Sequence, residues 1–536
     1  MLSSVFRIAG VVVLAVLAVV SVVATVLGAW QWIFAAVVLV PLAALGAHDL
    51  TQRRHSLLRN YPIVGRMRFL LEAVRPELQQ YFIERNFDGR PYDRDVRSLI
   101  YERAKGTTSD VAFGTERDID ADGYEYLVHS AAPLIPPDAP FRVRVGGPDC
   151  TQPYDMALLN VSSMSFGALS GNALRALNNG AHKGGFAHET GEGGLTPYHL
   201  GGADVIWEIG SGYFGTRAAD GRFDPRQFAD KAATEQVKGI LVKLSQGAKP
   251  GIGGVLPAAK VTEEIARYRG IPVGEKCVSP PAHSAFSTPR ELVFFIAQLR
   301  ELANGKPIGF KLCLGSRVDV LAICKAMLAE GITPDFIVVD GAEGGTAAAP
   351  PEYGDHVGLP LTDGLMTMHN ALVGTGLRDR IRLGASGKVA SGNDIVKRLI
   401  QGADYTNAAR AMMMAVGCIQ SQRCHTNHCP VGVATQDARR ARALDVEDKS
   451  ERAYRYQKAT VAQAMRLMAS MGVSDLSQLS PHLLRKRVSP TEQRTYAEIY
   501  EWLSPRQLLV ETPPTWLDDW MRANPDSFTP SALIRS

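Results

Sequence analysis

The feature that most constrains the fold of this chain is an alternation of two kinds of segment between about residues 154 and 409. Short apolar runs rich in β-branched residues, which are typical of buried parallel strands, alternate with longer amphipathic stretches. We predict strands at residues 156–162, 240–245, 308–314, 336–340, 381–386 and 403–409. The clearest predicted helices between them are residues 290–303 and 317–331. Such repeated strand–helix units predict an α/β domain.

Almost every predicted strand runs directly into a loop that is rich in glycine or polar residues. In a (β/α)8 barrel, the loops at the carboxyl ends of the strands build the active site, so this pattern favours a TIM barrel. A doubly wound sheet is the alternative, but no G-x-G-x-x-G sequence opens a predicted helix. We therefore predict an α/β fold with a (β/α)8 TIM barrel.

Two apolar runs lie near the amino terminus. Residues 8–28 carry no charge and are long enough to cross a bilayer, which takes about 20 apolar residues. A shorter run follows Trp30 and Trp32 and continues to about Ala47. Because arginines flank the pair on both sides, the positive-inside rule favours a transmembrane hairpin with both ends in the cytoplasm. A cleaved signal peptide and a buried core hairpin are the alternatives.

The chain has 536 residues, which is long for one ordinary domain. We predict a transmembrane helical hairpin, a connecting subdomain, the barrel and a C-terminal helical extension, at residues 1–50, 51–150, 151–440 and 441–536. A net charge of +4 gives no reason to expect nucleic-acid binding, which needs a concentrated basic face. We expect a protein of the cell inner membrane whose catalytic domain is cytoplasmic.

Three of the seven cysteines, Cys418, Cys424 and Cys429, lie in one short segment with the spacing Cys-x5-Cys-x4-Cys. A proline follows the last of them, and a Cys-Pro ending also occurs in the iron–sulfur runs of ferredoxins. Three thiolates alone suit a three-iron cluster. A zinc site would need a fourth ligand, which His425 or His428 could supply, so the spacing by itself leaves zinc open.

The whole cysteine segment, residues 417–437, resembles the part of glutamate synthase that binds a 3Fe-4S cluster. Eight further motifs resemble the synthase domain of that enzyme in the same order. They are MSFGALS (164–170), TGEGG (190–194), SGYFG (211–215), QGAKPGIGGVLPAAKV (246–261), SPPAH (279–283), GAEGGTAAAP (341–350), GLP (358–360) and LRDRIRL (377–383). The resemblance covers about residues 150–440 and points to the FMN-binding glutamate-synthase-like proteins.

The resemblance implies that the barrel binds FMN. Met164, Ser165 and Phe166 follow the first strand and resemble residues that lie against the flavin ring. Glycines after an apolar strand let the backbone approach a ligand, and the loops after the seventh and eighth strands of a barrel commonly bind phosphate. The further FMN-binding residues predicted in these loops are Gly341, Gly344, Gly345, Thr346, Ser386, Gly387, Asn407 and Arg410.

Three charged residues are the predicted catalytic groups. Lys311 lies on an apolar strand, where a lysine is costly to bury without a partner. It resembles a family lysine beside the flavin, where a cation stabilises the reduced, anionic form. The resemblance also implies that Lys249 holds a dicarboxylate or polarises an imine, and that Glu192 relays protons. A structural ion pair for Lys311 and solvated loop charges for the other two are the alternatives.

The chain departs from the family pattern. Glutamate synthase begins with a glutaminase domain whose nucleophile is an N-terminal cysteine, whereas Met1 here precedes the apolar runs. We therefore expect nitrogen from ammonia or an amine, with a possible amidotransferase partner, and electrons from ferredoxin, a reductase or a quinol. Glu208 stands where the family usually has glutamine, and Ala347 replaces a glycine of a GGTG motif. Both departures bear on the substrate.

These patterns favour a glutamate-synthase-like oxidoreductase acting on CH–NH2 groups. It would reductively aminate 2-oxoglutarate, or a close 2-oxo acid, by FMN fed through an iron–sulfur cluster. One alternative is an N-methylglutamate-type or other amine oxidoreductase with partner subunits. Another is a membrane electron-transfer component without synthase activity.

Overall fold

The structure is a computed structural model that describes residues 2–529. The chain divides into two compact units, one before and one after the bond between Pro91 and Tyr92. The domain boundaries predicted at residues 50, 150 and 440 stay predictions.

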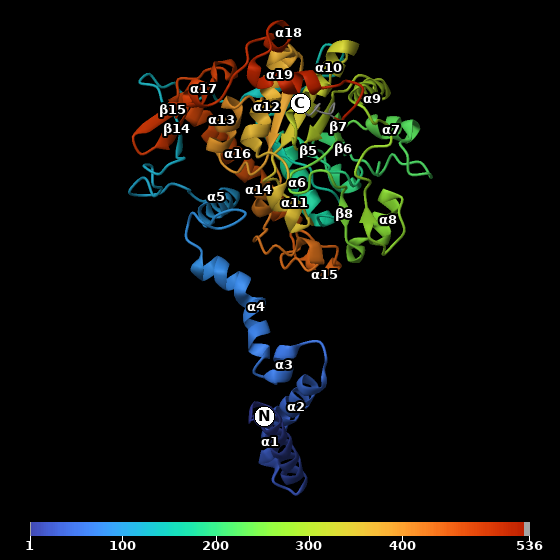
Figure 1. Cartoon of the computed structure of the whole chain (residues 1–536), viewed down its shortest axis with the longest axis vertical. Coiled ribbons are helices and arrows are strands. Elements are labelled where there is room, and N and C mark those ends of the chain that lie inside the picture. Colours follow the sequence, from blue (N-terminus) through green and yellow to red (C-terminus); the bar gives the residue numbers. More distant parts are fainter. Residues whose placement is uncertain (1, 530–536) are drawn as a thin grey trace, which may run out of the picture. The chain divides into compact units, whose positions relative to one another are not determined.

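Eight parallel strands in the second unit close into a barrel (Figure 1). In chain order they are β4 (Leu159–Val161), β5 (His188–Glu189), β6 (Val205–Ile209), β7 (Val237–Lys243), β10 (Ile308–Leu312), β11 (Phe336–Asp340), β12 (Arg382–Ser386) and β13 (Tyr405–Ala408). The last strand pairs in parallel with the first, with Thr406 opposite Leu159, which closes the ring. The predicted parallel barrel is confirmed.

All six predicted strands form at or within a few residues of their predicted positions, and β5 and β6 had no predicted counterpart. β5 has two residues, which is too short to show a period, and the apolar run of β6 contains Glu208. The barrel strands are buried on both faces, as expected for a sheet enclosed by helices.

Helices follow most of the strands. They include α6 (Gly171–Gly184), α7 (Pro225–Ala232), α9 (Pro289–Leu302), α10 (Arg317–Glu330), α12 (Leu361–Gly374), α13 (Gly392–Ile400) and α14 (Arg410–Ala415). Ser170, Thr288, Ser316 and Ser391 precede four of them, and each side-chain oxygen accepts a hydrogen bond from a first-turn amide. Such N-caps start each helix at a defined residue and thereby fix the length of the loop before it.

Further elements surround the barrel. They are α5 (Arg94–Lys105), β1 (Glu125–Leu127), β2 (Arg142–Val145), β3 (Tyr154–Ala157), β8 (Val255–Leu256), α8 (Glu263–Arg269), β9 (Cys277–Val278), α11 (Pro351–His356), α15 (Ala438–Arg442), α16 (Val446–Ser470), β14 (Leu484–Ser489), β15 (Glu492–Thr495), α17 (Tyr496–Ile499), α18 (Gln507–Val510) and α19 (Pro514–Arg522). β14 and β15, which form an antiparallel sheet with β1, add strands to the segment after residue 440, in which we predicted only helices.

The first unit contains a helical hairpin. Its elements are α1 (Leu2–Val26), α2 (Ile33–Thr51), α3 (Ser56–Asn60), α4 (Arg66–Leu78) and a π-helical turn (Gln79–Ile83). Two helices in this unit are long and apolar enough to cross a membrane, a test that signal sequences and core helices also pass. Most side chains of these spans are exposed in the chain by itself, which does not favour the buried core hairpin.

Candidate functional site

The first group of charged residues at the carboxyl ends of the strands surrounds Lys311 of β10. Its ammonium group forms an ion pair with Glu208 of β6 and donates a hydrogen bond to Ser163 Oγ at 2.7 Å. Glu189 of β5 accepts from the Ser163 backbone amide at 3.0 Å and from Asn407 Nδ2 of β13 at 2.6 Å. We call these five residues the Lys311 cluster. It joins the ends of four strands with the residues that follow β4.

The Lys311 cluster contains more carboxylates than cations. Burial opposes the charge of Lys311, but Glu208, Glu189 and Asp340 outweigh this effect and raise the pKa of the lysine. Burial also raises the pKa of Glu189 to about 7, although Lys311 opposes the shift, and the nearby Glu208 adds to it. Glu189 is therefore the carboxyl group in this cluster that can exchange a proton near neutral pH.

The second group, which we call the Glu192 cluster, consists of Glu192, Lys243, Lys249 and Arg269. Glu192 lies in the loop after β5, and its carboxylate forms an ion pair with Lys243 Nζ at 2.8 Å. Lys249, in the loop after β7, and Arg269, the last residue of α8, act on the same carboxylate. All three basic residues are buried. Three cations against one carboxylate leave this cluster an excess of two positive charges.

The Glu192 cluster retains capacity to bind an anion. Burial alone would raise the pKa of Glu192, but Lys243, Lys249 and Arg269 outweigh it and lower this pKa to about 2. Burial and the charge of Lys243 lower the pKa of Lys249 to about 8. Arg269 Nε has no hydrogen-bond partner among residues 2–529, and Lys249 Nζ donates to Ala348 O at a long 3.3 Å. These N–H groups are available to a ligand.

Two glycines make the ion pair of Glu192 possible. A Cβ atom on Gly254 would lie 2.0 Å from Glu192 Oε1, and one on Gly210 would lie 2.5 Å from Oε2. Real Cβ atoms do not approach oxygen so closely, so any larger residue at either position would displace the carboxylate. Gly210 and Gly254 are therefore needed for the geometry of the site.

The turn Met164–Phe166 after β4 links the two clusters. Ser163, the residue before it, belongs to the Lys311 cluster. Within the turn, Phe166 O accepts from Arg269 Nη2 at 3.1 Å, and Ser165 Oγ accepts from the same nitrogen at 3.4 Å. The structure thus brings the predicted flavin turn together with both groups of predicted catalytic residues.

The loops predicted to bind phosphate lie together after β11, β12 and β13. A Cβ atom on Gly345 would lie 2.7 Å from Arg410 Nε, and one on Gly387 would lie 3.4 Å from Gly341 N. The amide of Gly341 donates to Ser386 O at 2.8 Å. These five predicted residues therefore occupy one corner of the barrel mouth.

Two other predicted residues belong to the same corner. Gly344 N donates to Gly341 O at 2.8 Å and closes the turn after β11. Thr346 Oγ1 accepts from Gln246 Nε2 at 3.2 Å, which connects this turn to the loop after β7. All of the loop residues predicted to bind FMN thus lie at the carboxyl ends of the strands.

The three predicted metal ligands lie in the loop between α14 and α15. All are free thiols; Cys429 is buried, and Cys418 and Cys424 are half-buried. Across residues 2–529, no three His, Cys, Asp or Glu side chains are arranged to hold a metal ion. The thiols are nevertheless close enough for Cys424 and Cys429 to raise the pKa of Cys418, after the larger effect of burial. The cluster stays a prediction.

Sequence reasoning missed four residues of the two clusters. Ser163 directly precedes the predicted Met164–Phe166 turn but was not singled out. Lys243 ends a strand that was predicted, and a lysine inside an apolar run was the same signal that drew attention to Lys311. Glu189 ends the unpredicted strand β5, so no pattern marked it. Arg269 ends α8, and only the fold of the β8–α8–β9 segment places it beside the barrel.

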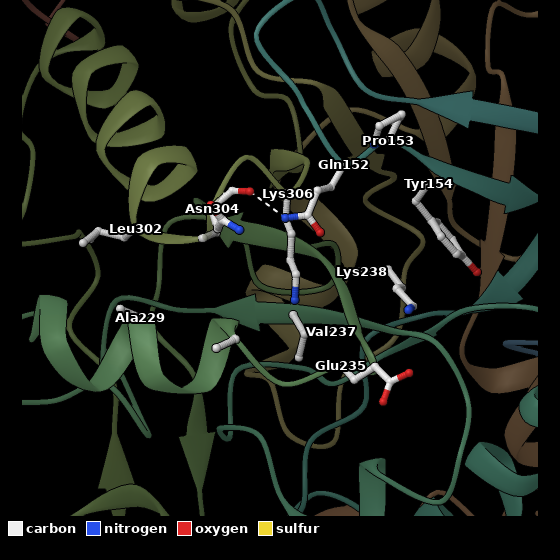
Figure 2. Close-up of a pocket in the computed structure, with 12 residues that line it drawn as sticks. Gln152, Pro153, Tyr154, Ala229, Glu235, Val237, Lys238, Leu302, Asn304 and Lys306 are labelled. Carbon is white, nitrogen blue, oxygen red and sulfur yellow. Dashed lines mark hydrogen bonds between the residues drawn. The ribbon is translucent and has the colours of Figure 1, made fainter.

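A separate hollow of about 510 Å³ lies near the amino ends of β7 and β10 (Figure 2). Its Lys306 Nζ donates to Ala232 O at 2.6 Å and Thr234 O at 3.0 Å, and Gln152 Nε2 donates to Asn304 O at 2.6 Å. These polar groups are satisfied within the chain. Because active sites of barrels lie at the opposite face, we assign the chemistry to the two clusters.

A comparison with known protein families matches the part of the chain that forms the barrel and its loops. Residues 153–474 match the conserved region in glutamate synthase. The chain belongs to the glutamate synthase family. The matched segment contains all eight strands of the barrel, both clusters and the cysteine loop.

Individual members of the glutamate synthase family differ in how much of their length this chain covers. The chain is 36% identical to the glutamate synthase large subunit-like protein YerD of Bacillus subtilis, over 82% of this chain and 91% of that one. It is 33% identical to the archaeal-type glutamate synthase (NADPH) of Thermotoga neapolitana, over 59% of this chain and 60% of that one. It is 34% identical to the glutamate synthase (NADPH) large chain of Azospirillum brasilense, over 51% of this chain and 17% of that one.

Among solved structures, a mutant flavocytochrome b2 with pyruvate bound aligns with 87% of this chain and 97% of its own. The TM-score is 0.41 and the identity is 12%, a likeness too weak to bear on function.

Proposed function

We propose that this chain is a glutamate-synthase-like oxidoreductase that carries out reductive amination of 2-oxoglutarate or a close 2-oxo acid. The observation that carries the proposal is the excess of two positive charges in the buried Glu192 cluster. A dicarboxylate with two negative charges would neutralise that excess. Lys249 and Arg269 still have N–H groups to donate, and hydrogen bonds between charged groups are the strong ones in a buried site.

FMN would bind on the side of the Met164–Phe166 turn that adjoins the Lys311 cluster. Asn407 Oδ1 is buried and accepts no hydrogen bond from any residue in the range 2–529, so one acceptor is left for a ligand. The grouped loops around Gly345 and Arg410 would hold the phosphate, and Lys311 would lie near the ring. FMN, when bound, supplies hydride transfer.

The residues of the chain would position the substrate and move its proton. Lys243, Lys249 and Arg269 hold the carboxylates, and Glu192 keeps Lys243 in place because its low pKa keeps it ionised. Glu189, whose pKa of about 7 suits proton exchange, would donate or accept the proton near the reacting carbon and nitrogen. Burial of both clusters excludes water from the reacting atoms.

The cysteine loop fits an iron–sulfur cluster by the chemistry of its donors. Three free thiols lie in one loop, and His425 and His428, the alternative zinc ligands, are exposed. We propose that Cys418, Cys424 and Cys429 hold a 3Fe-4S cluster that takes electrons from an external donor, such as ferredoxin, a reductase or a quinol. We also propose that the helical hairpin spans the inner membrane with the barrel in the cytoplasm.

Cofactor content and ligand binding test this function. Full-length protein should show flavin absorbance, an EPR signal of a three-iron cluster, and calorimetric binding of 2-oxoglutarate. Pyruvate is the matched control, because it has the 2-oxo acid group but lacks the second carboxylate, and it should bind at least tenfold more weakly. Protein that carries flavin but binds both acids equally would contradict the assignment of the Glu192 cluster.

The nitrogen donor needs a separate assay. Reduced protein should convert 2-oxoglutarate to glutamate with ammonia, and methylamine should replace it only if the chain is an N-methylglutamate-type enzyme. An amidotransferase partner would be indicated if glutamine supports the reaction only after a cell extract is added. Flavin-loaded protein that uses neither amine would favour an electron-transfer component.

A further inference from the structure

One buried cation lies outside the two clusters. Lys260 ends a short 3-10 turn, Ala258–Lys260, and its side chain is fully buried, at 0% exposure. The ammonium group donates to Ala168 O at 3.0 Å. Within the described range 2–529, it forms no ion pair with a carboxylate. A fully buried lysine without a counter-charge is rare, because desolvation of an ammonium group is expensive.

The surroundings of Lys260 show where a counter-charge would be. Asn427, which lies between Cys424 and Cys429 in the sequence, donates its side-chain amide to Ala259 O at 3.0 Å. This hydrogen bond holds the turn of Lys260 against the cysteine loop. The buried side chain of Lys260 therefore lies next to the loop that carries two of the three predicted metal ligands, Cys424 and Cys429.

A second set of contacts fixes the same arrangement from the barrel side. Gln436 Nε2, at the end of the cysteine loop, donates to Leu169 O at 2.7 Å and Gly167 O at 3.2 Å. Ala168, the acceptor of the Lys260 hydrogen bond, lies between these two residues. Lys260 is therefore held between the cysteine loop and the segment that follows the predicted flavin turn.

A buried ammonium group is stabilised by an anion beside it. Neutral thiols would give little compensation for a buried ammonium charge. Thiolates bound to iron carry negative charge and would provide it, and their own negative charge would in turn be stabilised.

We infer that Lys260 is the counter-charge of the iron–sulfur site and raises its reduction potential from a position between the cysteine loop and the flavin turn. This inference rests on the proposed cluster. Reduction adds one electron to a group that is already negative, and a fixed cation next to it favours the reduced form. Lys260 is thus a positioning residue for electron transfer and has no contact with substrate.

A redox titration of full-length holoprotein, followed by EPR, tests the inference. Lys260→Gln should lower the reduction potential of the cluster, with at least a tenfold change in the reduction equilibrium, which corresponds to 59 mV for one electron. Lys260→Arg keeps the charge and should restore most of the potential. Lys276→Gln removes an exposed lysine from a nearby part of the chain and should leave the potential unchanged.

The outcomes separate the two proposals. A wild-type protein that contains no iron overturns both the cluster and the role of Lys260. A wild-type cluster whose potential is the same in Lys260→Gln overturns only the role of Lys260. If Lys260→Gln loses iron while Lys260→Arg retains it, the charge is needed to assemble the anionic site, and the role of Lys260 as its counter-charge is supported.

Discussion

The two charged clusters of the barrel mouth differ in how far they are neutralised. In the Lys311 cluster, one lysine faces Glu208 and Glu189, with Asp340 nearby, so negative groups are in excess and the pKa of Glu189 is raised to about 7. In the Glu192 cluster, three cations face one carboxylate. Two neighbouring clusters of opposite charge balance can thus serve different steps. In the proposed function, the first would exchange protons and the second would hold an anionic substrate.

The largest expected effect comes from removing Glu192. Glu192→Gln would leave Lys243, Lys249 and Arg269 buried without a counter-charge, and such a loss costs about 3–5 kcal/mol of the free energy of unfolding. Urea unfolding at pH 7 measures it. The double variant Lys243→Met/Glu192→Gln also removes one of the three cations and should recover part of the loss. Equal destabilisation of the single and double variants would mean that the ion pair is unimportant.

The contrast between the clusters also predicts a pH dependence of stability. The folded pKa of Glu189 is about 7, above the ordinary value of 4.5, so the folded state binds more protons between these two values. Stability should therefore fall as pH rises from about 4.5 to 7, by at most about 3 kcal/mol. Glu189→Gln mimics the protonated form and should remove this fall. A wild-type and a variant protein with parallel stability profiles would contradict the shift.

Substrate binding gives the third test. Lys249→Met should weaken calorimetric binding of 2-oxoglutarate by about 1.5–3 kcal/mol, the usual value of a hydrogen bond to a charged group. The stability of the protein should hardly change, because Lys249 donates only one long hydrogen bond within the described residues. Lys306→Met, in the hollow at the other end of the barrel, is the matched control. Similar losses in both variants would remove the case for a specific site.

The smallest expected effect concerns the flavin. Glu208→Gln keeps the shape of the side chain but removes the negative charge that pairs with Lys311. The positive charge of the lysine would then be less neutralised, as the positive charges of the Glu192 cluster are. The reduced, anionic flavin should then be stabilised by about 1 kcal/mol, seen as a higher flavin reduction potential. Glu208→Asp should behave nearly as wild type. An unchanged potential in Glu208→Gln would show that Lys311 does not act on the flavin.

The barrel itself could be read from the sequence because its strands repeat one simple pattern. Residues 336–340 and 308–314 are apolar runs bounded by loops, and both became barrel strands at the predicted places. β5 could not be found in this way, since two residues show no period. Glu189, which ends β5 and is the residue proposed to exchange protons, was missed for the same reason.

The candidate site was predictable only in part. Lys311 was found because a lysine in an apolar strand is unusual, and Glu192 and Lys249 because their glycine-rich motifs resemble a known family. Nothing in the sequence indicated that Glu208 pairs with Lys311, because these residues are far apart in the chain and meet only because β6 and β10 lie on either side of β7. The partner of each charge depends on which strands are neighbours.

The class of fold, the family and the order of the motifs follow from the amino-acid sequence, since these depend on local pattern and on residue types at fixed spacing. Only the folded chain shows that three cations surround Glu192, that three carboxylates surround Lys311, and that Lys260 lies against the cysteine loop. The physical reason is that burial and charge balance are properties of the space between strands. They have no signature in any one segment of the chain.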